Sequence, residues 1–509
     1  MPEPHDDADA RTLRGLGYSQ ELGRQMGGFS NFALSFSIIC ILAGGVTSFH
    51  LGVCGVGGAS VGLGWPLVSL FALAVGATMA QVASAFPTAG GLYHWASLLG
   101  GRGWGWVTAW LNLAGLVTVI AAVNVGTWTF LVGSVGPLAG AGTGLIGRLE
   151  SAPAQAVGVA LITFTQAVLN HRGIRLTTRI TDLSGYLILA VSAALTGSVL
   201  YFAPAIQLSR LVTFSNFSGA AGGSVWPETQ SVGLLFALGL LLPAYTLTGF
   251  DASAHAAEET KGAAHEVPLG IVRSVAVAGL AGWALLASVV VSVPDLADLA
   301  AQGSRAFPWA LSVLLPRSLA ATLGVGIGLA MYGCGLGAVT SASRMAFAFA
   351  RDGGLPASEF FRRVDPGLRT PSRAVWLVAA GSWLFTLWTP FYTTITAVCT
   401  IFLYLSYVLP TALGAAAYGK TWTRMGPWDL GRAYRPLAWL CVAGCAGLIG
   451  VAVQPPNEAS AGVVAGTLGA LALFWFGRER RRFTGPPDAL SRSATSPAAV
   501  APLRETTGV

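Results

Sequence analysis

The sequence predicts an all-α polytopic membrane protein with about twelve transmembrane helices, and three observations lead to that prediction. The 509 residues are 53% hydrophobic and 10% charged, far fewer charges than soluble domains carry. Apolar runs of bilayer-crossing length recur along almost the whole chain. Two of these runs are interrupted near their middle by glycine, proline and hydroxyl residues.

The apolar runs give the expected spans and domain limits. The predicted spans are 31–57, 63–86, 104–133, 152–170, 179–203, 231–257, 269–293, 318–349, 373–389, 392–417, 433–453 and 460–476. They form one membrane domain at 26–476, with a polar tail at 1–25. The tail at 477–509 is rich in Pro, Ser, Thr and Ala, and we expect it to be disordered.

The basic residues predict the orientation of the spans. With the N-terminus placed inside, the 29 lysines and arginines fall in inside loops and tails, except Arg148, Arg210, Arg305 and Arg317. This bias predicts that both termini are cytoplasmic. It also explains the net charge of +7 through the anionic inner leaflet, without nucleic acid.

Other functional classes find little support in the sequence. It contains no HExxH pair, its six histidines lack metal-ligand spacing and its six cysteines form no CxxC pair. We therefore expect no metal site, no cofactor, and neither an enzyme nor an ATP-driven pump. The acidic start of the chain is unlike the basic region of a cleaved signal peptide, so the first span is expected to remain.

The span at 231–257 is predicted to break in its middle. Its first half is apolar throughout, and then come Pro243, Tyr245, Thr246, Thr248, Gly249 and Asp251. Unpaired backbone at this depth is tolerated only where it lines a protein-walled cavity, and broken helices form the binding sites of secondary transporters. The alternative is a proline-kinked helix without a site.

The first span carries a second predicted break, at Ala43–Ser48 with the sequence AGGVTS. Adjacent glycines and hydroxyls continue a helix poorly. The two broken spans are five apart, which is typical of an inverted-repeat transporter with its site between the halves. The alternative is that the glycines serve only helix packing.

Three ordered segments carry a resemblance to a known family. TGFDASAH at 248–255, with EET at 258–260 and VP at 267–268, is similar to a sixth-helix signature. SAFPTAGGLY at 84–93 is similar to the loop after helix 2, and SR at 343–344 with ARDGGLP at 350–356 to the end of helix 8. The chain thus resembles the amino acid–polyamine–organocation superfamily of permeases, in its amino acid and choline transporter branch.

The resemblance implies an architecture and a class of solute. Five helices at about 29–203 and five at about 231–417 form an inverted repeat with broken helices 1 and 6, and two extra helices follow at about 433–476. It also implies alternating access, and an amino acid, polyamine-like or choline-like solute.

The same resemblance assigns candidate site residues. The break in helix 1 would bind a carboxylate through backbone N–H groups of Gly44, Gly45, Val46 and Thr47, as a helix start favours an anion. The break in helix 6 would bind the amino end through backbone carbonyls, and Tyr245 could add an aromatic face. The candidate residues of the helix 6 break are Tyr245, Thr246, Leu247, Thr248 and Gly249.

Gating and coupling residues are also expected around helices 6 and 8. Asp251 is either an N-cap or gating residue or a direct cation ligand. Glu258 or Glu259 is expected to pair with Arg344 when an inner gate is shut. Thr340 and Ser341 could bind sodium, while the alternative coupling ion is a proton. Some members of the superfamily carry a lysine in helix 5 in place of a sodium ion. This chain lacks it, because its only lysines are Lys261 and Lys420, which both lie in predicted loops.

The predicted function is a secondary active transporter that imports an amino acid or a 4-aminobutyrate-like solute across the plasma membrane. The few aromatics at the breaks fit a zwitterion better than a quaternary ammonium ion. A choline or polyamine permease is the alternative, with aromatics such as Trp110 and Tyr404 completing a cage. A nutrient sensor or a channel fits less well. The partners are then a small solute and the bilayer.

Overall fold

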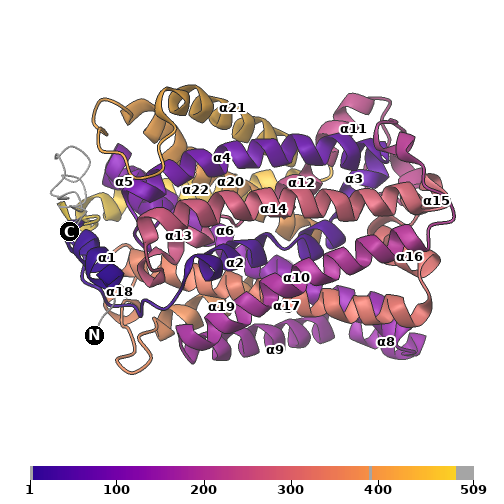
Figure 1. Ribbon diagram of the computed structural model, residues 1–509, viewed down its shortest axis with the longest axis horizontal. Coiled ribbons are helices and arrows are strands. Elements are labelled where there is room, and N and C mark those ends of the chain that lie inside the picture. The colour runs from indigo at the N-terminus through magenta and orange to yellow at the C-terminus, as the bar shows by residue number, and fades with distance from the viewer. Residues whose placement is uncertain (1–3, 389–391, 489–509) are drawn as a thin grey trace, which may run out of the picture.

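The computed structural model describes residues 4–388 and 392–488, and most of its helices run along one long axis (Figure 1). Helix α1 (Pro4–Gly15) and the last described residues lie at one end, here named the tail end. Helices α3 (Phe49–Val56), α15 (Leu296–Ala301) and α16 (Ala306–Leu314) lie at the opposite end, here the loop end. No strand forms within the described residues.

The prediction of an all-α polytopic membrane protein is confirmed. In the described part of the chain, 10 helical runs are long and apolar enough to cross a membrane. They begin within α2 (Gly28–Ile39) and continue through α4 (Trp65–Ala85), α6 (Arg102–Phe130), α9 (Ala152–His171), α10 (Ile174–Tyr201), α14 (Ala263–Ser292), α17 (Arg317–Arg351), α20 (Tyr392–Ala417), α21 (Tyr434–Ala452) and α22 (Glu458–Phe474).

The other two predicted spans are shorter. Helix α19 (Ser372–Trp388) has 17 residues, which still reach about 25 Å at the usual rise per residue. The span at 231–257 holds only the apolar run Val232–Thr246 before it breaks. Broken and short helices of this kind occur where neighbouring helices cover the backbone.

The first span breaks earlier than the sequence suggests. Helix α2 ends at Ile39, and Cys40 has φ 5° and ψ 91°, which no helix contains. A π-helical turn follows at Ile41–Gly45, and α3 begins at Phe49. The two glycines therefore close the turn after the break, because the chain leaves the helix several residues before them.

The sixth span breaks where the sequence predicts. Helices α11 (Val232–Gly239) and α12 (Leu241–Thr246) are followed by irregular backbone, and then by the short α13 (Ala252–His255). Gly249 has φ +92°, a left-handed conformation that glycine adopts without steric cost. Pro243 lies inside α12, so the proline is not the point at which the helix breaks.

The N-terminal residues are not a free tail. Residues 13–26, here the N-terminal strap, lie across the tail end with buried Leu13, Leu16, Tyr18, Leu22 and Met26. The backbone N–H groups of Gln25 and Met26 donate to the Glu259 carbonyl at 3.0 and 2.9 Å. The strap is thereby fastened to the segment that follows α13.

The C-terminal tail also begins later than predicted. The last span continues through a π turn at Trp475–Glu479 and helix α23 (Arg480–Arg482), and Phe483 is buried. The expectation of disorder from residue 477 is thus wrong for these first residues. Residues 489–509 lie outside the described residues.

The strap gives the first testable prediction. Arg24 donates hydrogen bonds to the carbonyls of Ala257 and Thr260, and bonds from a charged donor contribute about 1.5–3 kcal/mol each. We expect Arg24→Ala to speed amide hydrogen exchange in residues 16–26 by at least about tenfold. Arg11→Ala is the control, because Arg11 is exposed. Equal exchange in the two variants would show that Arg24 does not hold the strap.

Candidate functional site

A small cavity lies between the two helix breaks. It is lined by Ile38, Ile39, Ala43, Gly44, Val119, Val123, Tyr245, Thr246, Thr248 and Cys334. Its volume is about 10 Å³, which is near the lower limit for a single water. The structure therefore shows this site in a closed conformation, with the predicted binding elements in contact.

Glycines bring the two breaks together. A Cβ atom on Gly44 would lie 2.9 Å from the backbone Cα of Thr246 and 2.9 Å from its Oγ1. A Cβ atom on Gly249 would lie 2.4 Å from Cγ2 of Ile38, at the end of α2. Only residues without a side chain allow both approaches, so Gly44 and Gly249 have a steric role at the site.

The threonine hydroxyls of the breaks are satisfied internally in this conformation, whereas the buried Ser48 hydroxyl has no partner among the described residues. The hydroxyls of Thr47, Thr246 and Thr248 donate to the carbonyls of Ala43, Leu242 and Tyr245 at 2.7, 2.8 and 2.8 Å. The Cys334 thiol donates a hydrogen bond to the Ile38 carbonyl, with 3.3 Å between sulfur and oxygen. A solute entering the cavity must replace some of these bonds, which agrees with a closed state.

The predicted site residues divide into two groups. Gly44, Tyr245, Thr246 and Thr248 line the cavity. The others lie beside it, namely Gly45, Val46, Thr47, Leu247 and Gly249. A Cβ atom on Gly45 would meet Leu286 at 3.7 Å and Trp65 at 3.8 Å, which is ordinary van der Waals contact.

Asp251 is fully buried and makes no capping bond. Its Oδ1 accepts the Tyr407 hydroxyl at 2.8 Å, and its Oδ2 accepts the Asn112 amide at 2.9 Å. The same Oδ2 lies 3.3 Å from Nε2 of His255. Asp251 occupies the N-cap position of α13, but its side chain caps no backbone N–H, so the expectation of side-chain capping is wrong. The carboxylate instead joins α6 and α20 to the sixth-span break.

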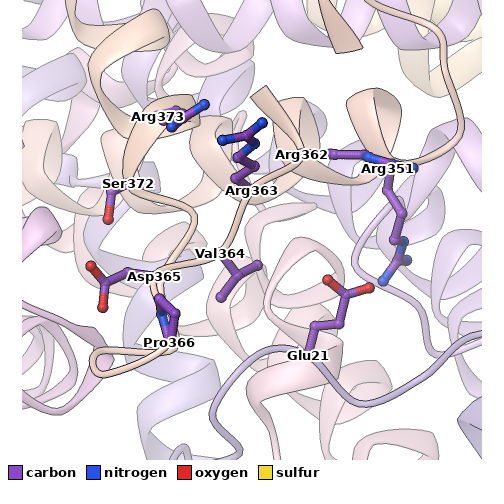
Figure 2. A pocket seen from close by; sticks show the side chains of 9 residues that line it. All are labelled: Glu21, Arg351, Arg362, Arg363, Val364, Asp365, Pro366, Ser372 and Arg373. Atoms are coloured by element: carbon purple, nitrogen blue, oxygen red, sulfur yellow. The ribbon is translucent and has the colours of Figure 1, made fainter. Parts of the chain in front are cut away.

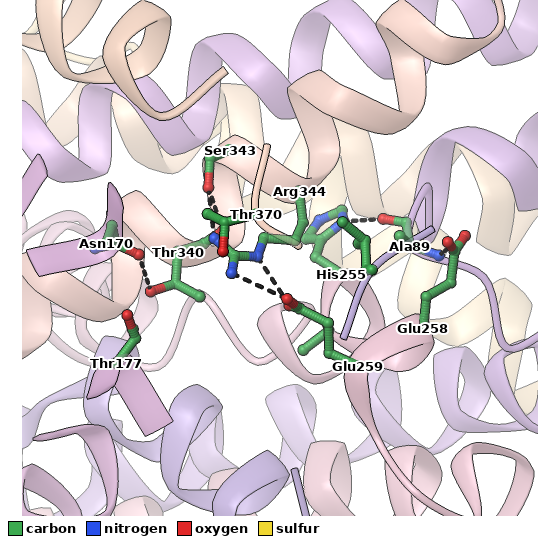
Figure 3. Close-up of polar contacts among 12 residues, drawn as sticks. Ala89, Asn170, Thr177, His255, Glu258, Glu259, Thr340, Ser343, Arg344 and Thr370 are labelled. Carbon is green, nitrogen blue, oxygen red and sulfur yellow. Dashed lines mark hydrogen bonds and ion pairs between the residues drawn. The ribbon is translucent and has the colours of Figure 1, made fainter. Parts of the chain in front are cut away.

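Two acid–arginine pairs lie between Asp251 and the tail end; Glu258, Glu259, Arg344 and Arg351 are here the acid–arginine cluster. Arg344 binds Glu259 with two bonds, of 2.8 and 3.1 Å, and both side chains are fully buried (Figure 3). Arg351 binds Glu258 with bonds of 3.0 and 2.8 Å. Arg344 thus pairs with Glu259 and not with Glu258.

The strap covers this cluster through Tyr18. The Arg351 guanidinium lies 4.0 Å above the Tyr18 ring, a cation–π contact. The Tyr18 hydroxyl donates to Asp352 at 2.9 Å, and His94 Nε2 lies 3.1 Å from the same oxygen. Burial and the charge of Asp352 raise the pKa of Tyr18 well above its usual range, so its hydroxyl stays protonated.

The Asp352 carboxyl shows the opposite shift. Burial alone raises its pKa, but the hydrogen bond and charge of His94, with the charge of Arg351, hold the pKa of Asp352 below its ordinary value. Asp352 is therefore ionised at neutral pH. It accepts the hydroxyls of both Tyr18 and Tyr93, at 2.9 and 2.8 Å.

A larger cavity of about 630 Å³ opens outside the cluster, at the tail end. Figure 2 shows Arg362, Arg363 and Arg373 along one side, and Glu21, Asp365 and Pro366 along the other. Arg351 belongs both to this cavity and to the cluster. The acid–arginine cluster thus borders this basic vestibule through Arg351.

The two residues considered for sodium binding differ in their contacts. The Thr340 hydroxyl lies 2.7 Å from Oδ1 of Asn170 on α9 and 3.0 Å from the Leu336 carbonyl. The Ser341 hydroxyl is buried and makes no hydrogen bond within the described part of the chain. Neither lines the small cavity.

Two short motif matches form no enzyme site. GASVG at 58–62 fits the pattern GxSxG, but Ser60 is fully buried and donates to the Gly57 carbonyl at 2.7 Å. GAAAYGKT at 414–421 fits GxxxxGK[ST], but its first half is the end of α20. A phosphate loop instead connects a strand to a helix start.

Sequence reasoning missed several residues of the site. Asn112 and Tyr407 hold Asp251, and Val119, Val123 and Cys334 line the cavity. An asparagine inside an apolar span is an available signal, because buried amides in membrane helices are costly without a partner. The valines and the cysteine carry no such signal.

The chain is similar in sequence to known permeases. The Amino acid permease family model matches residues 26–474. The chain belongs to this amino acid permease family. Amino-acid permease BAT1 of Arabidopsis thaliana is 31% identical, over 95% of this chain and 97% of the relative. A rice homologue of BAT1, from Oryza sativa subsp. japonica, is 33% identical over 86% of each chain. The GABA-specific permease of Saccharomyces cerevisiae is 28% identical, over 86% and 76%.

The family match fits the architecture. It begins at Met26, where the strap meets α2, and ends at Phe474, the last residue of α22. The matched residues thus include the helical bundle and both broken spans. Most of the strap and helix α23 lie outside the matched residues.

Two neighbouring glycines of this permease test the contact between the breaks. We expect Gly44→Ala to lower amino acid uptake at least about tenfold, because the new methyl group collides with backbone rather than with a flexible side chain. Gly45→Ala is the matched control and should keep uptake, since its Cβ has room. Uptake by reconstituted protein, normalised to folded protein, measures both. Full activity of Gly44→Ala would contradict the predicted contact.

Proposed function

We propose that this permease is a secondary active transporter that imports an amino acid or a 4-aminobutyrate-like solute across the plasma membrane by alternating access. The observation that carries the proposal is the closed cavity between two broken helices, sealed from the tail end by two buried acid–arginine pairs. With both termini in the cytoplasm, the tail end is the cytoplasmic side.

The inverted repeat belongs to this proposal. Helices α2 to α10 form one half and α11 to α20 the other, with α21 and α22 added. The two breaks occur in the first span of each half, and they meet at Gly44 and Thr246. Rocking of one half against the other would open the cavity alternately to each side.

The chemistry of the breaks favours a zwitterion. The N–H groups of Ala43 and Gly44 now donate to the Cys40 carbonyl, and we propose that in the open state this turn offers N–H groups to a carboxylate. The end of α12 at Thr246 would then offer carbonyls to an amino group. Among the residues that line the cavity, Tyr245 is the one aromatic, and none is acidic. A quaternary ammonium cage needs several aromatic faces, and a polyamine needs carboxylates.

The aromatics considered for a choline cage are committed elsewhere. The Tyr404 hydroxyl donates to the Ala244 carbonyl at 3.2 Å. Trp110 lines an apolar groove with Leu355 and Phe361. The 4-aminobutyrate part of the proposal is supported by the named specificity of the yeast relative, whose chain is 28% identical. Choline and polyamine transport remain the alternative.

Uptake into proteoliposomes tests the proposed function. We expect saturable uptake of an amino acid or of 4-aminobutyrate, with no competition by choline or spermidine. Labelled amino acids, 4-aminobutyrate, choline and polyamines form the panel, and sodium and proton gradients are imposed separately. Binding without uptake would favour a sensor, unsaturable flux a channel, and choline uptake alone would overturn the solute class.

The acid–arginine cluster is proposed as the inner gate. Breaking one partner of a buried ion pair costs about 3–5 kcal/mol, enough to shift the population from a closed to an open gate. We expect Arg344→Ala to speed modification of Cys334, kept as the sole cysteine, by a membrane-impermeant thiol reagent. The reagent is applied to the cytoplasmic face of inside-out vesicles.

The control for the gate is Arg362→Ala. Arg362 pairs with Glu359 at the surface, with side chains 47% and 79% exposed, and such pairs contribute only about 0–1 kcal/mol. In the Arg362→Ala variant, Cys334 should react at the same rate as in the protein that has Cys334 as its sole cysteine and keeps Arg344 and Arg362. Faster reaction of the Arg344→Ala protein from the outer face instead would reverse the proposed orientation.

A further inference from the structure

Asp251 and His255 form a buried acid–histidine pair. Both side chains are fully buried; Asp251 directly precedes α13 and His255, four residues on, is its last residue. His255 Nδ1 lies 3.1 Å from the Ala89 carbonyl, and Nε2 lies 3.3 Å from Oδ2 of Asp251 (Figure 3 shows the first contact). Both ring nitrogens therefore face oxygen atoms that can accept a hydrogen bond.

The geometry fixes the number of protons that the contact needs. A backbone carbonyl only accepts, so Nδ1 of His255 carries a hydrogen. A bond between Nε2 and Asp251 then requires one further proton, held either on the imidazole or on the carboxyl. With that proton the pair is neutral overall. Without it, the pair carries one negative charge and sets two lone pairs against each other, which drives the side chains apart.

We propose that Asp251 and His255 are the proton-coupling site of the transporter, so that the coupling ion is H⁺ rather than Na⁺. This inference rests on the proposed function, because it assigns the ion that drives uptake. One proton enters the pair with the solute and leaves it toward the cytoplasm. Loss of the proton breaks the contact and moves α13, and with it the sixth-span break.

Tyr407 links the pair to the solute cavity. Its hydroxyl donates to Oδ1 of Asp251 at 2.8 Å and accepts the Gly249 N–H at 3.0 Å. Gly249 directly follows Thr248, which lines the cavity. On α6, Asn112 holds Asp251 seven residues from Val119 of the cavity wall, a distance of about 10 Å along the helix. The pair thus lies just below the cavity, on its tail side.

The backbone of Ala89 links the pair to the inner gate. Its carbonyl faces His255 at 3.1 Å, and its N–H donates to Oε1 of Glu258 at 3.1 Å. Glu258 in turn pairs with Arg351. Separation of the Asp251–His255 contact therefore frees the Ala89 carbonyl, on the same residue whose N–H holds Glu258, and the change in protonation is transmitted to the gate.

Few other groups compete for the proton. Helix α13 packs against α2, α14, α17 and the segment after it, and Asp251 contacts Tyr407 of α20. The titratable or charged side chains of these elements include Arg344 and Arg351 on α17, Glu258 and Glu259 after α13, and Cys399 on α20. On α14, His265 and Arg273 are exposed and Glu266 is half-buried. Both glutamates are committed to arginines, and Tyr407 donates its proton to Asp251. Asp251 with His255 is the pair without a fixed cationic partner.

Proteoliposomes loaded with a pH-sensitive dye test the inference in sodium-free potassium buffer with valinomycin. Adding the best-transported amino acid of the panel should acidify the lumen of wild-type vesicles, and uptake should fall as the external pH rises. His255→Gln and Asp251→Asn should lose acidification, and Asp251→Glu should recover part of it. His50→Gln is the control, because His50 is buried but forms no ion pair within the described residues.

The outcomes separate this inference from the proposed function. Absence of any wild-type uptake refutes the function itself. Uptake without acidification, or uptake that needs sodium, refutes proton coupling and leaves the function standing. Acidification that persists in folded His255→Gln and Asp251→Asn refutes the assignment to this pair. If neither variant folds, the infrared difference spectrum of wild-type protein with and without solute decides, and no carboxyl or imidazole change overturns the inference.

Discussion

The close contact between the two broken helices is the constraint on which the rest of the structure depends. Gly44 meets Thr246 and Gly249 meets Ile38 at distances that exclude any side chain. Each break leaves backbone groups at membrane depth, where water is absent and an unpaired group is costly. The two breaks must therefore be enclosed by protein, and α6, α14, α17 and α20 surround them. The backbone groups that would be costly to leave unpaired at the breaks are also the groups that a solute could bind when the local hydrogen bonds open.

Burial of charge at the tail end follows from the same arrangement. Glu258, Glu259, Arg344 and Asp251 are all fully buried, which is tolerable only because each has partners of complementary charge or hydrogen-bonding type. Bidentate pairs of this kind contribute little net stability but are costly to leave half-broken. A cluster that is either fully paired or fully hydrated has two distinct states. That property suits a gate better than a permanent wall.

Sequence reasoning predicted the helical class, the spans and the position of the second break, because span length and midplane glycines are local signals. It placed the first break at 43–48, whereas the helix ends at Ile39, since the deciding feature is the three-dimensional approach of Gly44 to Thr246. It could not choose between Glu258 and Glu259 as the partner of Arg344, because neighbouring residues differ only in direction around a turn. The buried strap was missed because its five apolar residues are spread among polar ones and acquire their environment only from the folded bundle.

The pattern of hydrogen bonds gives the breaks, the buried pair and the gate a common physical basis. Tyr407 connects the backbone of the sixth-span break to Asp251, and the backbone of Ala89 connects His255 to Glu258. The strap then connects the other side of this region, since Met26 and Gln25 donate to the Glu259 carbonyl. Every link in this series joins a different element, and each involves a buried group that loses about 1–3 kcal/mol if left unpaired. A change at the cavity therefore cannot stay local: the break, the gate and the strap are linked through groups that each need a partner, and they are stable only in combinations that satisfy all of them.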